Sequence, residues 1–120
     1  MKKIFTIIGV LFSIAVFAQN GDDVVNALKE GSAAKFTNYF SSTVDLKFPQ
    51  KDEMKNVVKA DAASAVANFF SANNINGFEV TSQREMSGTM YIAGKLKNNS
   101  KNFNLTVMLK NGLVITVRIN

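Results

Sequence analysis

Residue types that most often carry out chemistry are sparse in this chain. Its 120 residues include no histidine and no cysteine, so the commonest general base, the thiol nucleophile and the usual transition-metal ligands are missing. The sequence also shows no glycine-rich phosphate-binding loop. We therefore expect no cofactor and no metal site, and only carboxylates remain as candidates for catalysis.

Four carboxylates stand at positions that can be assigned from the local pattern. Asp45 alternates with apolar neighbours, which predicts a side chain on the solvent side of a strand. Asp61 falls in the first turn of a predicted helix, where a carboxylate is favoured by the helix dipole without any function. Glu79 and Glu85 fall on the polar face of a strand and in a turn. No residue is assigned a catalytic role, and a carboxylate-only isomerase or hydrolase is left as the least favoured alternative.

The start of the chain has the three parts of a secretory signal. Two lysines precede an uncharged apolar run over residues 4–17, and Val16 and Ala18 stand at the −3 and −1 positions. The run is shorter than the roughly 20 residues that cross a bilayer. We predict a signal peptide over residues 1–18, cleaved between Ala18 and Gln19, with an uncleaved anchor as the alternative. The mature protein is then exported to the periplasm or the cell exterior, with no stable membrane span, and without cysteine it is not a lipoprotein.

The charge of the mature chain is mild and scattered. Loss of Lys2 and Lys3 leaves 12 basic and 9 acidic side chains, a net charge of +3. The basic residues form no cluster along a helix face and do not alternate with aromatic residues, as they would in a surface that stacks bases. We therefore predict no nucleic-acid partner. Residues 19–120 are enough for one domain and not for two.

Hydrophobic periodicity and turn residues predict an α+β fold. The predicted elements are a helix ending at Gly31, a helix over residues 33–40 capped by Ser32, a strand over 44–48 stopped by Pro49, a short return strand at 57–58, a helix within 59–73, and four strands over 78–84, 89–97, 102–110 and 113–119. Helices followed by a meander favour N-terminal helices and one longer helix packed on one face of an antiparallel sheet. That sheet would combine the four-strand C-terminal meander with a short N-terminal hairpin.

Alternation in the meander predicts its register. With Leu96 opposite Phe103, Ile92 faces Val107 and Met90 faces Leu109. A three-residue final turn would then place Leu113, Ile115, Val117 and Ile119 on the same core face, so we prefer it to a two-residue Asn-Gly turn.

The opposite face of the meander would carry apolar side chains away from the helices. In this register these are Tyr91, Met108 and Val114. Three adjacent apolar side chains on an uncovered face indicate an association surface, and a homodimer through this face is one expectation.

Aromatic residues mark the helices. Phe36, Tyr39 and Phe40 recur at helical spacing, a pattern more typical of a core than of a ligand site. Phe69 and Phe70 straddle the buried stripe of the third helix, so at least one of them should lie in the core.

These elements together resemble a family of short exported bacterial proteins of unknown function. The resemblance rests on residues spread over nearly the whole mature chain: Gly31, Tyr39, Phe40, Val44, Leu46, Phe69, Phe70, Tyr91, Ile92, Gly94, Arg118 and Ile119. It implies a nuclear transport factor 2-like, or cystatin-like, fold, in which a curved sheet wraps round helices to form a cone with an apolar pocket. The aromatic residues that would line such a pocket are Phe36, Tyr39, Phe40, Phe69 and Phe103. The resemblance implies no activity.

Two functions are therefore expected ahead of catalysis. The first is a non-catalytic exported binding module that holds a small apolar or amphipathic ligand in the cone. The second is an envelope interaction or self-associating structural module that uses the outer sheet face.

Overall fold

The computed structural model describes residues 21–120, and the predicted signal peptide and its cleavage point lie outside the described residues. The described part begins with a helix over residues 21–29. The elements that follow are α2 (Ala33–Thr37), β1 (Phe40–Lys47), β2 (Met54–Val58), α3 (Lys59–Ala72), β3 (Gly77–Met86), β4 (Thr89–Lys97), β5 (Asn102–Lys110) and β6 (Leu113–Ile119). None of the helices within residues 21–120 has the length and hydropathy that a bilayer crossing requires.

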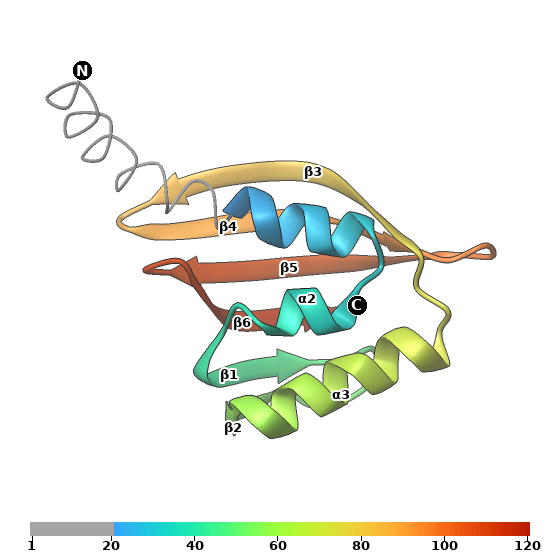
Figure 1. The fold of residues 1–120 in the computed structure, drawn as a ribbon, viewed down its shortest axis with the longest axis horizontal. Helices are drawn as coiled ribbons and strands as arrows, with labels where there is room; N and C mark the ends of the chain where they lie inside the picture. Colours follow the sequence, from blue (N-terminus) through green and yellow to red (C-terminus); the bar gives the residue numbers. More distant parts are fainter. Residues whose placement is uncertain (1–20) are drawn as a thin grey trace, which may run out of the picture.

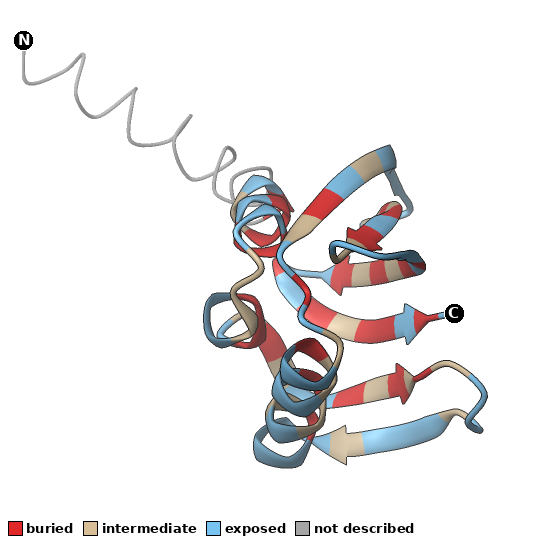
Figure 2. Ribbon diagram, turned by 90° about the vertical axis from the view of Figure 1, so that its right-hand side faces the viewer, coloured by how far each residue is buried: buried red, intermediate tan, exposed pale blue. Residues whose placement is uncertain are grey.

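The six strands form one curved, mixed sheet with the order β2-β1-β6-β5-β4-β3. All neighbouring strands are antiparallel except β1 and β6, which pair in parallel. Within residues 21–120, the helices lie together on one face of the sheet and none lies over the other face (Figures 1 and 2). The α+β prediction is therefore confirmed, and the parallel pair that joins the hairpin to the meander is the feature that the sequence did not predict.

Two local motifs make the sharp turn between the first two helices. The N–H groups of Gly31 and Ser32 donate to the carbonyls of Leu28 and Ala27, at 2.9 and 3.0 Å, and Gly31 has φ +70°. This is a Schellman ending with glycine in the left-handed position. The Ser32 hydroxyl then accepts from the Lys35 N–H and caps α2. Both predictions for this junction are confirmed.

The predicted length of the second helix was wrong, because α2 ends at Thr37 rather than at Phe40. The Tyr39 carbonyl accepts a hydrogen bond from the Val114 N–H at 2.7 Å, and Phe40 pairs with Val114 as the first residue of β1. Sheet pairing with a strand far along the chain therefore outweighs the local helical spacing. Phe36 and Phe40 still share the core, with ring centroids 5.2 Å apart.

The third helix packs on the sheet through a narrow stripe. Ala62, Val66 and Phe70 are buried, whereas Phe69 is half-buried. The Phe70 ring stacks on Phe36 at 6.3 Å. The expectation that at least one of the two adjacent phenylalanines lies in the core is confirmed.

The register of β4 and β5 is the predicted one, but the final turn is not. Leu96 pairs with Phe103 and Met90 pairs with Leu109. Lys110 pairs with Leu113, which leaves a two-residue turn.

That turn has Asn111 at φ 55° and Gly112 at φ 78°, the left-handed pair that a tight hairpin turn favours. A bulge in β6, at Ile115, then shifts the register by one residue, so Val107 pairs with Val117 farther along. Val114 is consequently fully buried, which corrects its assignment to the outer face, and Leu113 is 42% exposed in its place.

We expect Phe70→Ala to cost about 3–5 kcal/mol of unfolding free energy, because it removes a buried ring and leaves a cavity. Phe69→Ala is the matched control, and its loss should be smaller because that ring is only half-buried. Thermal and urea unfolding would measure both. Equal large losses would contradict the difference in burial between the two rings. If both variants melt within a degree or two of the unmodified protein, α3 is not the packing partner of the sheet.

Candidate functional site

The five aromatic residues expected to line an apolar pocket fall into two packed groups. Phe36 and Phe40 belong to the buried group around Phe70. Phe69 stacks on Phe48 at 5.5 Å and meets Phe103 edge-on at 5.2 Å, with the Lys101 ammonium 5.0 Å from the Phe103 centroid. Tyr39 belongs to neither group. Most of the predicted lining therefore fills the interior with ring-to-ring contacts.

Two hollows lie elsewhere on the described part of the chain. The first, with a volume of about 170 Å³, is at the end of the sheet where the β3–β4 and β5–β6 turns meet (Figure 1, left). It is lined by Glu85, Gly88, Met90, Leu109, Asn111 and Gly112. We call it the hairpin-end hollow.

Strand register explains which side chains reach the hairpin-end hollow. Glu85 pairs with Met90, and Met90 pairs with Leu109, so the three side chains stand in a row across β3, β4 and β5 on the face that the helices cover. Leu109 is buried, Met90 is half-buried and Glu85 is exposed. The turn glycines Gly88 and Gly112 close the end without side chains. The result is an apolar floor with one carboxylate at its rim.

The start of the first helix forms another boundary of this region. A side chain at Gly21 would meet the Met90 sulfur and the Gln83 amide. The Gln83 amide nitrogen itself lies 3.7 Å from that sulfur. Glycine at this position therefore lets the helix start directly against the strand that provides the apolar floor.

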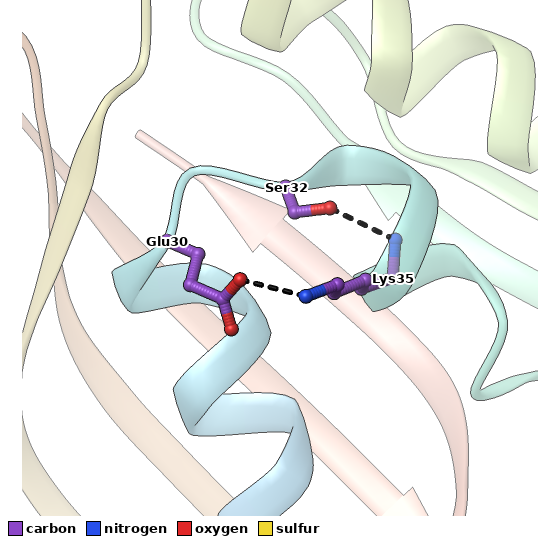
Figure 3. A network of polar contacts seen from close by, with 3 residues as sticks. All are labelled: Glu30, Ser32 and Lys35. Carbon is purple, nitrogen blue, oxygen red and sulfur yellow. Dashed lines mark hydrogen bonds and ion pairs between the residues drawn. The ribbon is translucent and has the colours of Figure 1, made fainter.

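The second hollow, of about 290 Å³, is polar and lies between the first helix and α2. Its lining comprises Asp23, Asn26, Ala27, Glu30, Lys35, Asn38 and Tyr39. The Lys35 ammonium donates to the Glu30 carboxylate at 2.8 Å, beside the Ser32 cap (Figure 3). That hydrogen bond raises the pKa of Lys35. Both partners of the ion pair are exposed, so it adds little to stability.

Of the predicted aromatic set, Tyr39 alone borders one of these two hollows. Burial raises the pKa of its phenol, and the charge of Asp23 and a hydrogen bond with it add to the effect. The phenol is therefore a neutral group at physiological pH. Its neighbours in the polar hollow offer hydrogen-bond donors and acceptors to a small polar molecule.

The sequence contained unused signals for both hollows. The turn clusters at Glu85–Gly88 and Asn111–Gly112 must meet at one end of a meander, because alternate turns of antiparallel strands lie on the same side. Asp23, Asn26 and Glu30 recur at the spacing of one helix face. Of the carboxylates considered for catalysis, Glu85 lines the hairpin-end hollow and lies in β3 rather than in the predicted turn. Asp45 and Asp61 lie elsewhere. Asp45 accepts from the Asn56 N–H at 2.9 Å on the outer side of β1, and Asp61 is exposed in the first turn of α3.

The shifted phenol of Tyr39 gives a pH prediction. The chain has two tyrosines. In the Tyr91→Phe variant, an absorbance titration of phenolate formation therefore reports Tyr39 alone. The midpoint should lie above the ordinary value of 10.0, and Asp23→Asn should lower it. Because the folded pKa is raised, the phenol's contribution to stability is present below pH 10 and is lost as the pH rises through the folded pKa. Asp22→Asn is the control and should leave the midpoint unchanged, whereas a midpoint at or below 10 would contradict the contact.

Similar proteins are known from their structures, although none of the curated proteins matches the chain. A DUF4783 family protein from Bacteroides ovatus is 31% identical, with a TM-score of 0.74 over 81% of this chain and 90% of that one. A protein of unknown function from Cytophaga hutchinsonii, described as NTF2-like, is 9% identical, with a TM-score of 0.61 over 87% and 88%. A cystatin-fold protein from Novosphingobium aromaticivorans is 10% identical, with a TM-score of 0.62 over 87% and 97%.

The last two likenesses show the fold alone, which is the NTF2-like, or cystatin-like, fold that the sequence resemblance implied. The model of the DUF4783 family, a domain of unknown function, matches residues 21–120, which is the whole of the described chain. This protein therefore belongs to the DUF4783 family.

Proposed function

We propose that this protein is a non-catalytic exported binding module and that its ligand is a small amphipathic molecule held in the hairpin-end hollow. The observation that carries the proposal is the row formed by Glu85, Met90 and Leu109 on the helix-covered face of the sheet. An apolar floor with one convergent polar group is the usual composition of a small-molecule site.

The chemistry of the row defines the class of ligand. Met90 is an unbranched, polarizable side chain that adapts to different apolar shapes. The carboxylate of Glu85 accepts hydrogen bonds and attracts positive charge. A short alkyl or aryl group that ends in an ammonium group therefore fits better than one that ends in a carboxylate.

The size of the hollow limits what it holds. Its volume of about 170 Å³ is below the roughly 300–1,000 Å³ of typical drug-sized sites. The site would therefore enclose only the apolar end of a ligand. Binding would be weak for a molecule of this size, since few atoms are removed from water.

A binding role is supported over a catalytic one by where the carboxylates lie. Glu85 is the one carboxylate that lines the hairpin-end hollow, and within residues 21–120 no group of three or more His, Cys, Asp or Glu side chains could hold a metal ion. The sequence has no histidine or cysteine to act with Glu85. A single exposed carboxylate orients a ligand more readily than it activates one.

We expect n-hexylammonium to bind the hairpin-end hollow and hexanoate to bind it much less. In two-dimensional NMR, shifts on addition of n-hexylammonium should centre on Gly88, Met90, Leu109 and Gly112. Glu85→Gln should weaken binding at least threefold, because it removes the charge and keeps the shape. The dissociation constant from the titration measures the effect.

Glu79→Gln is the matched control for the ligand test. Glu79 lies on the same strand, but its carboxylate forms an ion pair with the Lys97 ammonium at 3.2 Å, away from the hollow. Its replacement should therefore leave binding unchanged. Equal binding of hexanoate, shifts centred on other residues, or an unchanged affinity in Glu85→Gln would each reject the proposed site.

A further inference from the structure

The uncovered face of the sheet carries a row of side chains that is complementary to itself. Arg84 pairs with Tyr91, Tyr91 with Met108, Met108 with Thr116, and Thr116 with Asp45. The row therefore crosses β3, β4, β5, β6 and β1 in that order. Each member alternates with side chains of the helix-covered face, so all five point to the uncovered face. We call it the outer row.

The outer row has opposite charges at equal distances from its centre. Arg84 and Asp45 each lie two strands from Met108, about 10 Å away at the usual strand spacing. A two-fold axis along β5 would place Arg84 of one copy over Asp45 of a second copy and Met108 over Met108. Two such ion pairs form at once, because the contact is isologous.

The neighbouring row supports the same symmetry. Ser82 pairs with Ala93, Ala93 with Thr106, Thr106 with Arg118, and Arg118 with Lys47. The same axis places the long cations Arg118 and Lys47 over the small side chains Ala93 and Ser82. Basic side chains thus meet small neutral ones rather than each other.

The dimensions suit a dimer. Measured along the curved sheet, five strands of about eight residues cover roughly 24 by 27 Å, or about 650 Å² per copy. Two copies would then bury on the order of 1,300 Å², within the range of specific interfaces. Stacked sheets lie about 10 Å apart. An arginine side chain from one sheet and an aspartate side chain from the other can together span this gap. An aligned packing angle of about 30° would shift Arg84 by about 5 Å along its partner strand, which is within the reach of its side chain.

We propose that the outer face binds a second copy of this chain, with Met108 on the two-fold axis and Arg84 paired with Asp45 of the second copy. The surface lies on the opposite side of the sheet from the hairpin-end hollow, so it does not depend on the ligand. One feature opposes the contact. Lys110, on β5 next to the axis, would face Lys110 of the second copy.

A charge swap tests this arrangement by sedimentation of the purified protein at micromolar concentration. We expect Arg84→Glu and Asp45→Arg each to weaken association at least tenfold, and the double variant to restore it to within about threefold. Lys110→Ala should tighten association. Lys29→Glu, which makes the same charge change on an exposed position of the first helix, should have no effect.

Asp45 also holds the Asn56 N–H, so circular dichroism must show that its variants fold. If Asp45→Arg does not fold, Met108→Lys replaces it and should abolish the dimer. A protein that is monomeric at about 100 μM overturns the proposal. Binding of anionic lipid vesicles or of an acidic protein to this face would not rescue it. Failure of the folded double variant to restore association overturns it as well.

Discussion

The bulge between β5 and β6 determines which side chains reach each face of the sheet. A two-residue turn alone would place Val107 opposite Thr116 and mix apolar and polar side chains on both faces. The extra residue, Ile115, moves the pairing by one position, so Leu109 pairs with Val114 near the turn and Val107 pairs with Val117 beyond it. The helix-covered face is therefore apolar on both sides of the bulge. The same shift leaves Met108 opposite Thr116 on the outer face.

Features that depend on neighbours in the chain could be predicted from the sequence. The Gly31 and Ser32 motifs, the buried stripe of α3 and the β4–β5 register all follow from spacing within a few residues or across one short loop. The length of the last turn could not be predicted, because a two-residue turn followed by a bulge keeps Val117 and Ile119 in the core just as a three-residue turn does. Only the bulge distinguishes the two turn lengths, and it depends on pairing along the whole hairpin.

The end of α2 shows the same limit. Helical spacing of Phe36, Tyr39 and Phe40 also fits a short helix followed by a strand, since both arrangements bury Phe36 and Phe40. The group that decides between them is the N–H of Val114, far along the chain. The parallel pairing of β1 with β6 depends on the same long-range contact. The sequence thus predicted the aromatic core, and four of the five aromatic residues expected to line a pocket make ring-to-ring contacts in the structure.

Filling of the interior also explains where binding sites can lie in this protein. Without disulfides, a domain of this size is stabilised mainly by its core, and the phenylalanine rings provide it through mutual contacts. One hollow lies where strands end in glycine-containing turns, because Gly88 and Gly112 bring no side chain to that end of the sheet. Space for a partner is left on the face that no helix of the described chain covers (Figure 2).

Native mass spectrometry of the protein purified from its own cell envelope tests most directly the claim that this is a binding module with one site on each face of the sheet. It reports the mass of the mature chain, the number of copies and any retained molecule together. We expect twice the mass of residues 19–120, with a small amine-containing ligand bound to each copy. A single copy with nothing bound, at a concentration where two copies should associate, would contradict this claim.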